Sequence, residues 1–134
     1  PHLAKSAEQQ RGKVVIGTVT GDMHDIGKNL VVTMLRGVGF EVIDLGVNVS
    51  RQQFCDAVAQ HRPEVLGLSA LLTTTMMEMR EVIRALDQRG LRPACKVFVG
   101  GAPVSEKFAR QIGADGFAAD AVQAVNEAKR LLAA

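Results

Sequence analysis

Short apolar runs alternate along the chain with longer segments in which apolar residues recur every three or four positions. Residues 14–19 form a run rich in β-branched side chains, and in 26–38 the apolar positions are 26, 30, 31, 34, 35 and 38. The first pattern is typical of a buried strand and the second of an amphipathic helix. The same pair recurs four more times, which predicts strands at 41–45, 65–69, 96–99 and 116–118 and helices at 51–61, 75–89, 104–112 and 121–132.

This alternation of strands and helices predicts an α/β fold. Strands separated by helices pair in parallel through right-handed crossovers, and their continuously apolar sequences indicate a sheet covered on both faces. We expect a Rossmann-like (flavodoxin-like) three-layer sandwich with a five-stranded parallel sheet in the order 2-1-3-4-5. Gly39, Gly90 and Gly113 each follow a predicted helix, where a left-handed residue commonly ends the helix.

The composition argues against two classes of function. Hydrophobic residues make up 47% of the 134 residues and charged residues 22%, and no apolar run approaches the roughly 18 residues of a membrane span. The formal charge of +2 comes from 16 basic and 14 acidic residues scattered along the chain, so no basic block could neutralise a row of phosphates. We therefore expect a globular domain that binds neither nucleic acid nor a membrane.

The cysteines and the N-terminal residues carry weaker signals. Cys55 and Cys95 are isolated, lack Cys-x-x-Cys spacing and follow no apolar signal sequence. These features favour a reducing compartment, the cytoplasm, and a role for both residues as buried small hydrophobic side chains. Residues 1–12 are polar and rich in small residues, so we expect a linker or the frayed end of a helix before a single domain at 13–134.

Ligands of such sheets bind at the carboxyl ends of the strands, near the point where the strand order reverses. The loops that follow the first, third and fourth predicted strands are therefore the places to look for function. They span 20–25, 70–75 and 100–103.

The first of these loops contains a candidate metal ligand. Asp22 and His24 are separated by one residue on a turn, and a carboxylate bonded to one imidazole nitrogen leaves the other nitrogen free to bind a metal. A solvated loop histidine would have the same sequence, and Asp25 is placed to cap the next helix. His2 and His61 lie far away in the sequence, so a closed zinc site with four protein ligands is improbable. A metal that brings its own equatorial ring, as in a corrin, needs only one axial group.

Three motifs in register then resemble the signature of cobalamin-binding domains. The signature is Asp-x-His-x-x-Gly, then Ser-x-Leu after about 41 residues, then Gly-Gly after about 27 more. In this chain 41 and 28 residues separate the three motifs. The matching residues are Asp22, His24 and Gly27, then Ser69 and Leu71, then Gly100 and Gly101.

The resemblance implies cobalamin or a related corrinoid as cofactor, with its own nucleotide base displaced from cobalt. His24 would be the axial cobalt ligand and the Ser69 hydroxyl would bond the displaced base. Gly27 would let the nucleotide tail run close to the backbone, and Gly100 and Gly101 would keep the floor of its slot free of side chains. The remaining cofactor contacts that the resemblance implies are Asp22, Met23, Asp25, Ile26, Leu71, Thr73 and Thr75.

Details of the motifs are similar to methionine synthase and to the small corrinoid proteins of methyltransferase systems. These details are residues 22–29, 44–49 and 67–76, and Ile26, where cobalamin-dependent isomerases usually carry Arg. In methionine synthase a serine completes a His-Asp-Ser relay, and Thr75 occupies that position. The resemblance therefore gives His24, Asp22 and Thr75 as the catalytic relay, with the geometry at Thr75 open.

The resemblance implies a methyl carrier that works in the methylcobalamin form, as a subunit or domain of a cobalamin-dependent methyltransferase. It would accept a methyl group on Co(I) from a donor-specific methyltransferase and pass it to tetrahydrofolate or a thiol through an acceptor methyltransferase. In this type an N-terminal helical cap usually shields the cofactor, so 1–12 would be a linker or a remnant of the cap. The alternatives are an adenosylcobalamin-dependent isomerase small domain and a corrinoid-sensing regulatory module. A phosphate-accepting receiver domain would share the sheet order but would need an acid where Ser69 stands.

A cluster of methionines follows the second motif. Met76, Met77 and Met79 could suggest a soft-metal site. Their spacing with 82, 83 and 86 is instead that of a helix face, so we expect all three to pack in the core.

Overall fold

The computed structural model describes residues 12–134, and its centre is one parallel sheet in the order β2-β1-β3-β4-β5. This confirms the predicted fold class and strand order. The predicted linker or cap remnant at 1–12 lies outside the described residues except for its last position, and His2 lies outside them as well. The strands are β1 (Lys13–Thr18), β2 (Glu41–Asp44), β3 (Val65–Ser69), β4 (Lys96–Gly100) and β5 (Gly116–Ala118).

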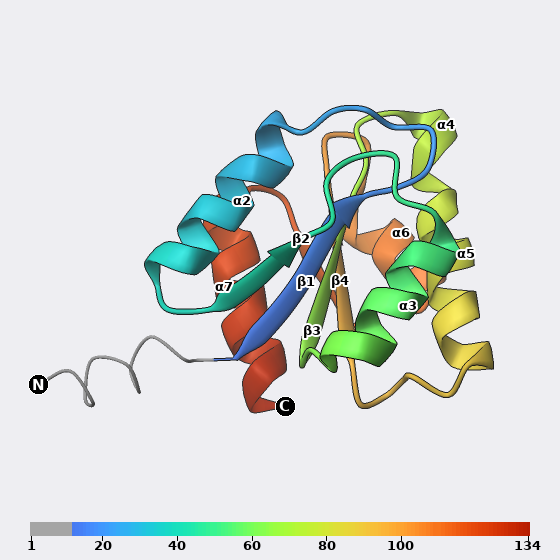
Figure 1. The fold of residues 1–134 in the computed structure, drawn as a ribbon. Coiled ribbons are helices and arrows are strands. Elements are labelled where there is room, and N and C mark those ends of the chain that lie inside the picture. The colour runs from blue at the N-terminus through green and yellow to red at the C-terminus, as the bar shows by residue number, and fades with distance from the viewer. Residues whose placement is uncertain (1–11) are drawn as a thin grey trace, which may run out of the picture.

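Helices cover both faces of the sheet (Figure 1). On one face lie α2 (Ile26–Gly37) and α7 (Ala121–Ala133), and on the other lie α3 (Arg51–His61), α5 (Glu78–Gln88) and α6 (Glu106–Gln111). No helix in residues 12–134 is long and apolar enough to cross a membrane. Gly39, Gly90 and Gly113 have φ of 102°, 70° and 83°, which confirms their predicted places after helices.

Successive residues of the strands supply two separate apolar cores. Val14 and Ile16 of β1 pack with α2 and α7, whereas Val15 packs with α3 and α5. Cys55 and Cys95 are free and buried, as predicted, and burial raises the pKa of the Cys95 thiol to about 12. Burial also raises the pKa of the Cys55 thiol, so both thiols are protonated and inert at neutral pH.

The helix predicted at 75–89 is two helices, α4 (Thr73–Met76) and α5, which meet at Met77. Met79 is buried and Met76 packs against the core, as predicted, but Met77 is exposed at the junction, so the prediction that it is a core residue is wrong. The break separates a short helix held by the loop after β1, through a hydrogen bond from Thr75 to Asp22, from a helix packed along the sheet.

Helix side chains cap the two outer strands of the sheet. On β2, Arg36 of α2 donates to the carbonyl oxygen of Val42 at 3.0 Å. Next to β5, Glu127 of α7 accepts from the amide of Phe117 at 3.2 Å, and Arg130 donates to the carbonyl oxygen of Asp115 at 2.8 Å. One carbonyl oxygen of β2, and one amide and one carbonyl oxygen next to β5, are thus occupied and closed to another strand.

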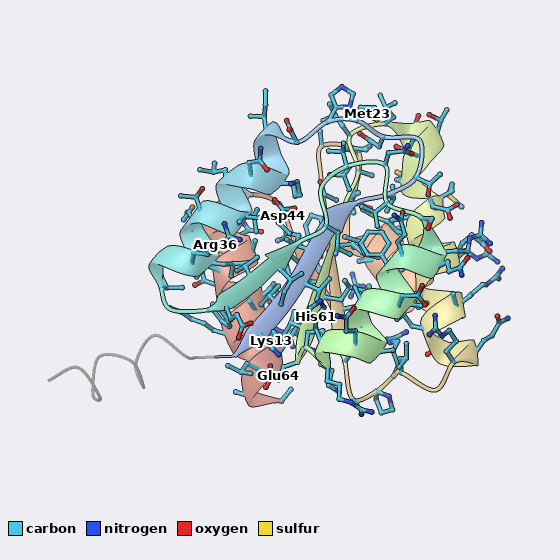
Figure 2. The ribbon with its side chains drawn as sticks, viewed as in Figure 1. Lys13, Met23, Arg36, Asp44, His61 and Glu64 are labelled. Atoms are coloured by element: carbon cyan, nitrogen blue, oxygen red, sulfur yellow. The ribbon has the colours of Figure 1, made fainter. Side chains whose placement is uncertain are left out.

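The amino end of β1 lies opposite the loop predicted to carry function. Figure 2 shows Lys13, His61 and Glu64 together at one end of the sheet, and Met23 at the other. Lys13 donates its ammonium proton to the His61 carbonyl at 3.0 Å and its amide to Glu64 at 2.8 Å. His61 is thus remote from His24, as the sequence led us to expect.

Candidate functional site

The loops after β1, β3 and β4 meet at the carboxyl edge of the sheet, as predicted. The amide of Val19 donates to the carbonyl oxygen of Ser69 at 3.0 Å, and the amide of Ala70 donates to the carbonyl oxygen of Gly100 at 3.2 Å. The loop after β2 joins them, because the amide of Asn48 donates to the carbonyl oxygen of Asp22 at 3.0 Å. Backbone hydrogen bonds therefore join the four loops into one edge, and Asp22 lies in the first of them.

Asp22 is fully buried, and both of its carboxylate oxygens are bonded. Oδ1 lies 2.9 Å from His24 Nδ1 and accepts from the His24 amide at 3.1 Å. Oδ2 accepts from the Leu71 amide at 2.7 Å and the Thr75 hydroxyl at 2.6 Å, with the Leu72 amide at 3.4 Å. Burial alone would raise the pKa of Asp22, but the bonds from Thr75, Leu71 and His24 hold the pKa well below its usual range. Asp22 is therefore a permanent anion at neutral pH.

His24 combines a fixed backbone with an accessible ring. Its carbonyl oxygen accepts from the Thr18 hydroxyl at 3.0 Å, and its side chain is 54% exposed. Because the anion of Asp22 faces Nδ1, the neutral imidazole carries its proton there and directs an unprotonated Nε2 away from Asp22. That nitrogen can serve as a single metal ligand. Residues 12–134 hold no group of three or more His, Cys, Asp or Glu that could bind a metal ion, so the metal would have to bring its other ligands.

A cavity of about 350 Å³ opens beside His24 between α2, α7 and the sheet. Its exposed rim includes His24, Gly27, Leu71 and Asp120, and deeper positions are mostly small or apolar. Ser69 lies in the wall, and its hydroxyl makes no hydrogen bond to any residue in 12–134. A Cβ added at Gly27 would meet no protein atom within 4 Å, so that position leaves open space at the cavity wall. The cavity and the adjacent free imidazole nitrogen fit a large cofactor whose metal needs one protein ligand.

Gly100 and Gly101 line the cavity, but the backbone also requires them. A Cβ on Gly101, whose φ is 130°, would lie 1.8 Å from the carbonyl oxygen of Ala70, and one on Gly100 would lie 2.9 Å from that of Ala118. The motif resemblance explained these two glycines only by the need to keep the floor of the cofactor slot free of side chains. The structure adds that the chain itself passes too closely for any side chain.

The other predicted site residues lie around the rim without entering the cavity wall. Met23 and Ile26 are exposed, and Ile26, at 87%, is the first residue of α2. Asp25 occupies the N-cap position as predicted, but its side chain makes no capping bond. Thr73 is exposed at the start of α4. Thr75, whose geometry the sequence left open, is in bonding contact with Asp22.

Several residues of the site were missed from the sequence, including apolar residues of the strands and of α2 that line the cavity. Lys28 is buried and lines the cavity, with its ammonium 2.7 and 2.8 Å from the two carboxylate oxygens of Asp44. The spacing held a signal, because Lys28 is one helical turn before Val32 and two before Leu35, both buried. Also missed were the loop and first turns after β5, where residues 118–121 and 124 line the cavity.

Comparison with known proteins agrees with this geometry. Residues 12–126 match the B12 binding domain family. The chain is 48% identical over 128 residues to dimethylamine corrinoid protein 3 of Methanosarcina mazei, covering 96% of this chain and 77% of the relative. It spans about 60% of several other corrinoid proteins that it matches.

Solved structures give the same answer. A cobalamin-binding protein from Desulfitobacterium hafniense has a TM-score of 0.88 and 44% identity over 91% of this chain and 60% of its own. The methanol:cobalamin methyltransferase complex MtaBC of Methanosarcina barkeri has a TM-score of 0.86 and 35% identity over 92% of this chain and 47% of its own.

Receiver domains resemble the chain in fold alone. That of NarL from Mycobacterium tuberculosis has a TM-score of 0.67 but 21% identity, covering 91% of this chain and 96% of its own. The family match and the identity to corrinoid proteins go further than the shared fold. This chain belongs to the B12-binding domain family, as a domain of the corrinoid-protein type whose cofactor is cobalamin or a related corrinoid.

Proposed function

We propose that this domain is a methyl carrier that holds cobalamin with His24 as the axial ligand and the cofactor's own base displaced into the cavity. It would receive the methyl group from a donor-specific methyltransferase and deliver it to tetrahydrofolate or a thiol through a second one. The observation that carries the proposal is the contact of His24, Asp22 and Thr75 at the rim of the cavity. Bound cobalamin would supply a cobalt centre that takes up and gives away the methyl group.

The residues around His24 suit this role. Asp22 holds the ring in the tautomer with a free Nε2, and the bonds from Leu71 and Thr75 hold Asp22 in place. The low pKa of Asp22 keeps its carboxylate ionised opposite His24 Nδ1, so the pair could hold a proton on the imidazole whenever Nε2 is not a metal ligand. The Thr75 hydroxyl donates to Asp22 at 2.6 Å, so threonine would act here as the serine does in the His-Asp-Ser relay of methionine synthase.

The surface around His24 supports contact with a large macrocycle. Met23, Ile26, Leu71 and Leu72 all expose apolar side chains near the strand ends. Clusters of exposed apolar side chains commonly mark binding sites. The apolar parts of a corrin ring would cover them, and any helical cap or methyltransferase would approach from the same side.

We expect His24→Ala to bind cobalamin without a histidine ligand. The cobalt(II) form of the wild-type complex should show nitrogen coupling in its electron paramagnetic resonance spectrum that changes when histidine is labelled with ¹⁵N. The variant should lack that change and have a different visible spectrum and Co(II)/Co(I) potential. His61→Ala is the control, because His61 lies at the other end of the sheet (Figure 2). An unchanged spectrum and potential in His24→Ala would show that the ligand assignment is wrong.

We expect Gly27→Leu to weaken cobalamin binding about tenfold or more, because the new side chain would occupy cavity space meant for the cofactor. Gly37→Leu is the matched control. Gly37 is in the same helix, a Cβ there also meets nothing within 4 Å, and it does not line the cavity. Titration of both apoproteins with cobalamin measures the effect, and urea unfolding checks that both fold. Equal affinities in the two variants would place the cofactor elsewhere.

A further inference from the structure

The deep end of the cavity is apolar. We define the deep end as the apolar buried side chains that line the cavity on the face of α2 and α7, where the buried ammonium of Lys28 is the charged neighbour. These apolar side chains are Ile16, Phe98, Ala118, Ala121 and Ala124. The Phe98 ring lies over Gly67, where an added Cβ would come within 2.8 Å of it, so the ring closes the space above the sheet. A group that enters the deep end would therefore exchange most of its water for hydrocarbon.

Several polar groups near the deep end already have partners within the chain. The ammonium of Lys28 faces both oxygens of Asp44. The carbonyl oxygens of Ser69 and Gly100 accept from backbone amides, and the amide of Ala119 donates to a glutamine side chain. The Ser69 hydroxyl makes no hydrogen bond to any described residue, so it can make one with a ligand.

We infer that this cavity selects among corrinoids by the lower base, preferring an apolar benzimidazole over a purine such as adenine. The inference rests on the proposed function, in which the displaced base enters the cavity. Dimethylbenzimidazole has one free ring nitrogen, which can accept from Ser69, and its methyl groups suit a wall of Phe98, Ile16 and alanines. Adenine has further ring nitrogens and an amino group, which would lose water and gain no partner.

The test is a titration of the apoprotein with three corrinoids, followed by absorbance. They are cobalamin, the otherwise identical adenine-base cobamide, and cobinamide, which lacks the nucleotide. The adenine form should bind at least about tenfold more weakly than cobalamin, since unpaired buried polar groups cost at least that factor. Equal affinity for cobalamin and the adenine form would overturn the inference and leave the proposed function standing. If the apoprotein bound neither cobalamin nor cobinamide, both the proposed function and this inference would be overturned.

Comparing two variants of the protein cancels any effect that comes from the corrinoids themselves, such as differences in how the free forms behave in solution. Ala124→Ser places a hydroxyl in the deep end and should narrow the preference for cobalamin several-fold. Ala128→Ser is the control, because Ala128 is one turn further along α7 and is 0% exposed, against 1% for Ala124, but does not line the cavity. Should Ala128→Ser shift the preference as much as Ala124→Ser, the inference would be wrong.

Ser69→Ala tests the hydroxyl without adding volume to the core. It should weaken cobalamin binding several-fold and leave cobinamide binding unchanged. An equal loss for both corrinoids would contradict the assigned contact between Ser69 and the base. Urea unfolding of each apoprotein separates changes in binding from loss of the fold.

Discussion

Gly101→Ala should lower the free energy of unfolding by about 4 kcal/mol, the sum of a severe overlap and an unfavourable φ. The added Cβ would lie 1.8 Å from the carbonyl oxygen of Ala70, so the loops after β3 and β4 would have to separate. Ala70 donates its amide to Gly100 in the same place, and the separation would strain that bond as well. Urea unfolding of the apoprotein measures the loss without any contribution from the cofactor.

Gly113→Ala distinguishes overlap from backbone strain. Gly113 has φ of 83°, and a Cβ there meets nothing within 4 Å. The left-handed backbone conformation is then the only source of strain, and Gly113→Ala should lower the free energy of unfolding by about 1 kcal/mol. Similar losses for the two variants would show that the close approach of Ala70 to Gly101 does not hold in solution.

Asp22→Ala should lower the free energy of unfolding by about 3 kcal/mol at pH 7. The Leu71 amide and the His24 ring would lose their acceptor, while Thr75 would keep only the carbonyl oxygen of Leu72, at 3.1 Å. Hydrogen bonds to a buried charged group are among the costliest to break. Asp25→Ala is the control, since Asp25 is exposed and its side chain makes no capping bond. If Asp22→Ala lowered the free energy of unfolding no more than Asp25→Ala does, the hydrogen-bond network around Asp22 would be contradicted.

The same network predicts how stability changes with pH. The pKa of Asp22 is lower in the folded chain than its unfolded value of about 4, so the unfolded chain binds more protons as the pH falls. The stability from Asp22 is therefore complete above about pH 4 and is lost as the pH drops further. Unfolding curves should show that the difference between wild type and Asp22→Ala shrinks from pH 5 to pH 2. A difference that stays constant over this range would show that Asp22 keeps its ordinary pKa in the folded domain.

The sequence predicted the strands well because each is a compact apolar run, and their alternation with helices leaves few topologies. It also placed Asp22, His24 and Ser69 correctly at one edge, because parallel strands end on the same side of a sheet. The bond from Thr75 to Asp22 depends on the short helix α4, whose separation from α5 no residue pattern marks.

Other features depended on distances that only the folded chain defines. The helical spacing places Lys28 on the buried face of α2, but only the fold shows that Asp44 of β2 lies opposite its ammonium group. The need for glycine at Gly101 comes from the backbone of Ala70, 31 positions earlier in the chain. The alanines after β5 have no chemical signature, and they line the cavity only because α7 folds back beside α2.

The capped outer strands have a consequence for how a carrier meets its partners. Under the proposed function the domain would bind and release two methyltransferases, and a strand added to its sheet would form a long ladder of backbone bonds. Arg36 and Arg130 occupy carbonyl oxygens, and Glu127 occupies an amide, that such a ladder would need. A partner would then bind through side chains of the helices and of the loops around His24 rather than by extending the sheet, which suits complexes that must also come apart.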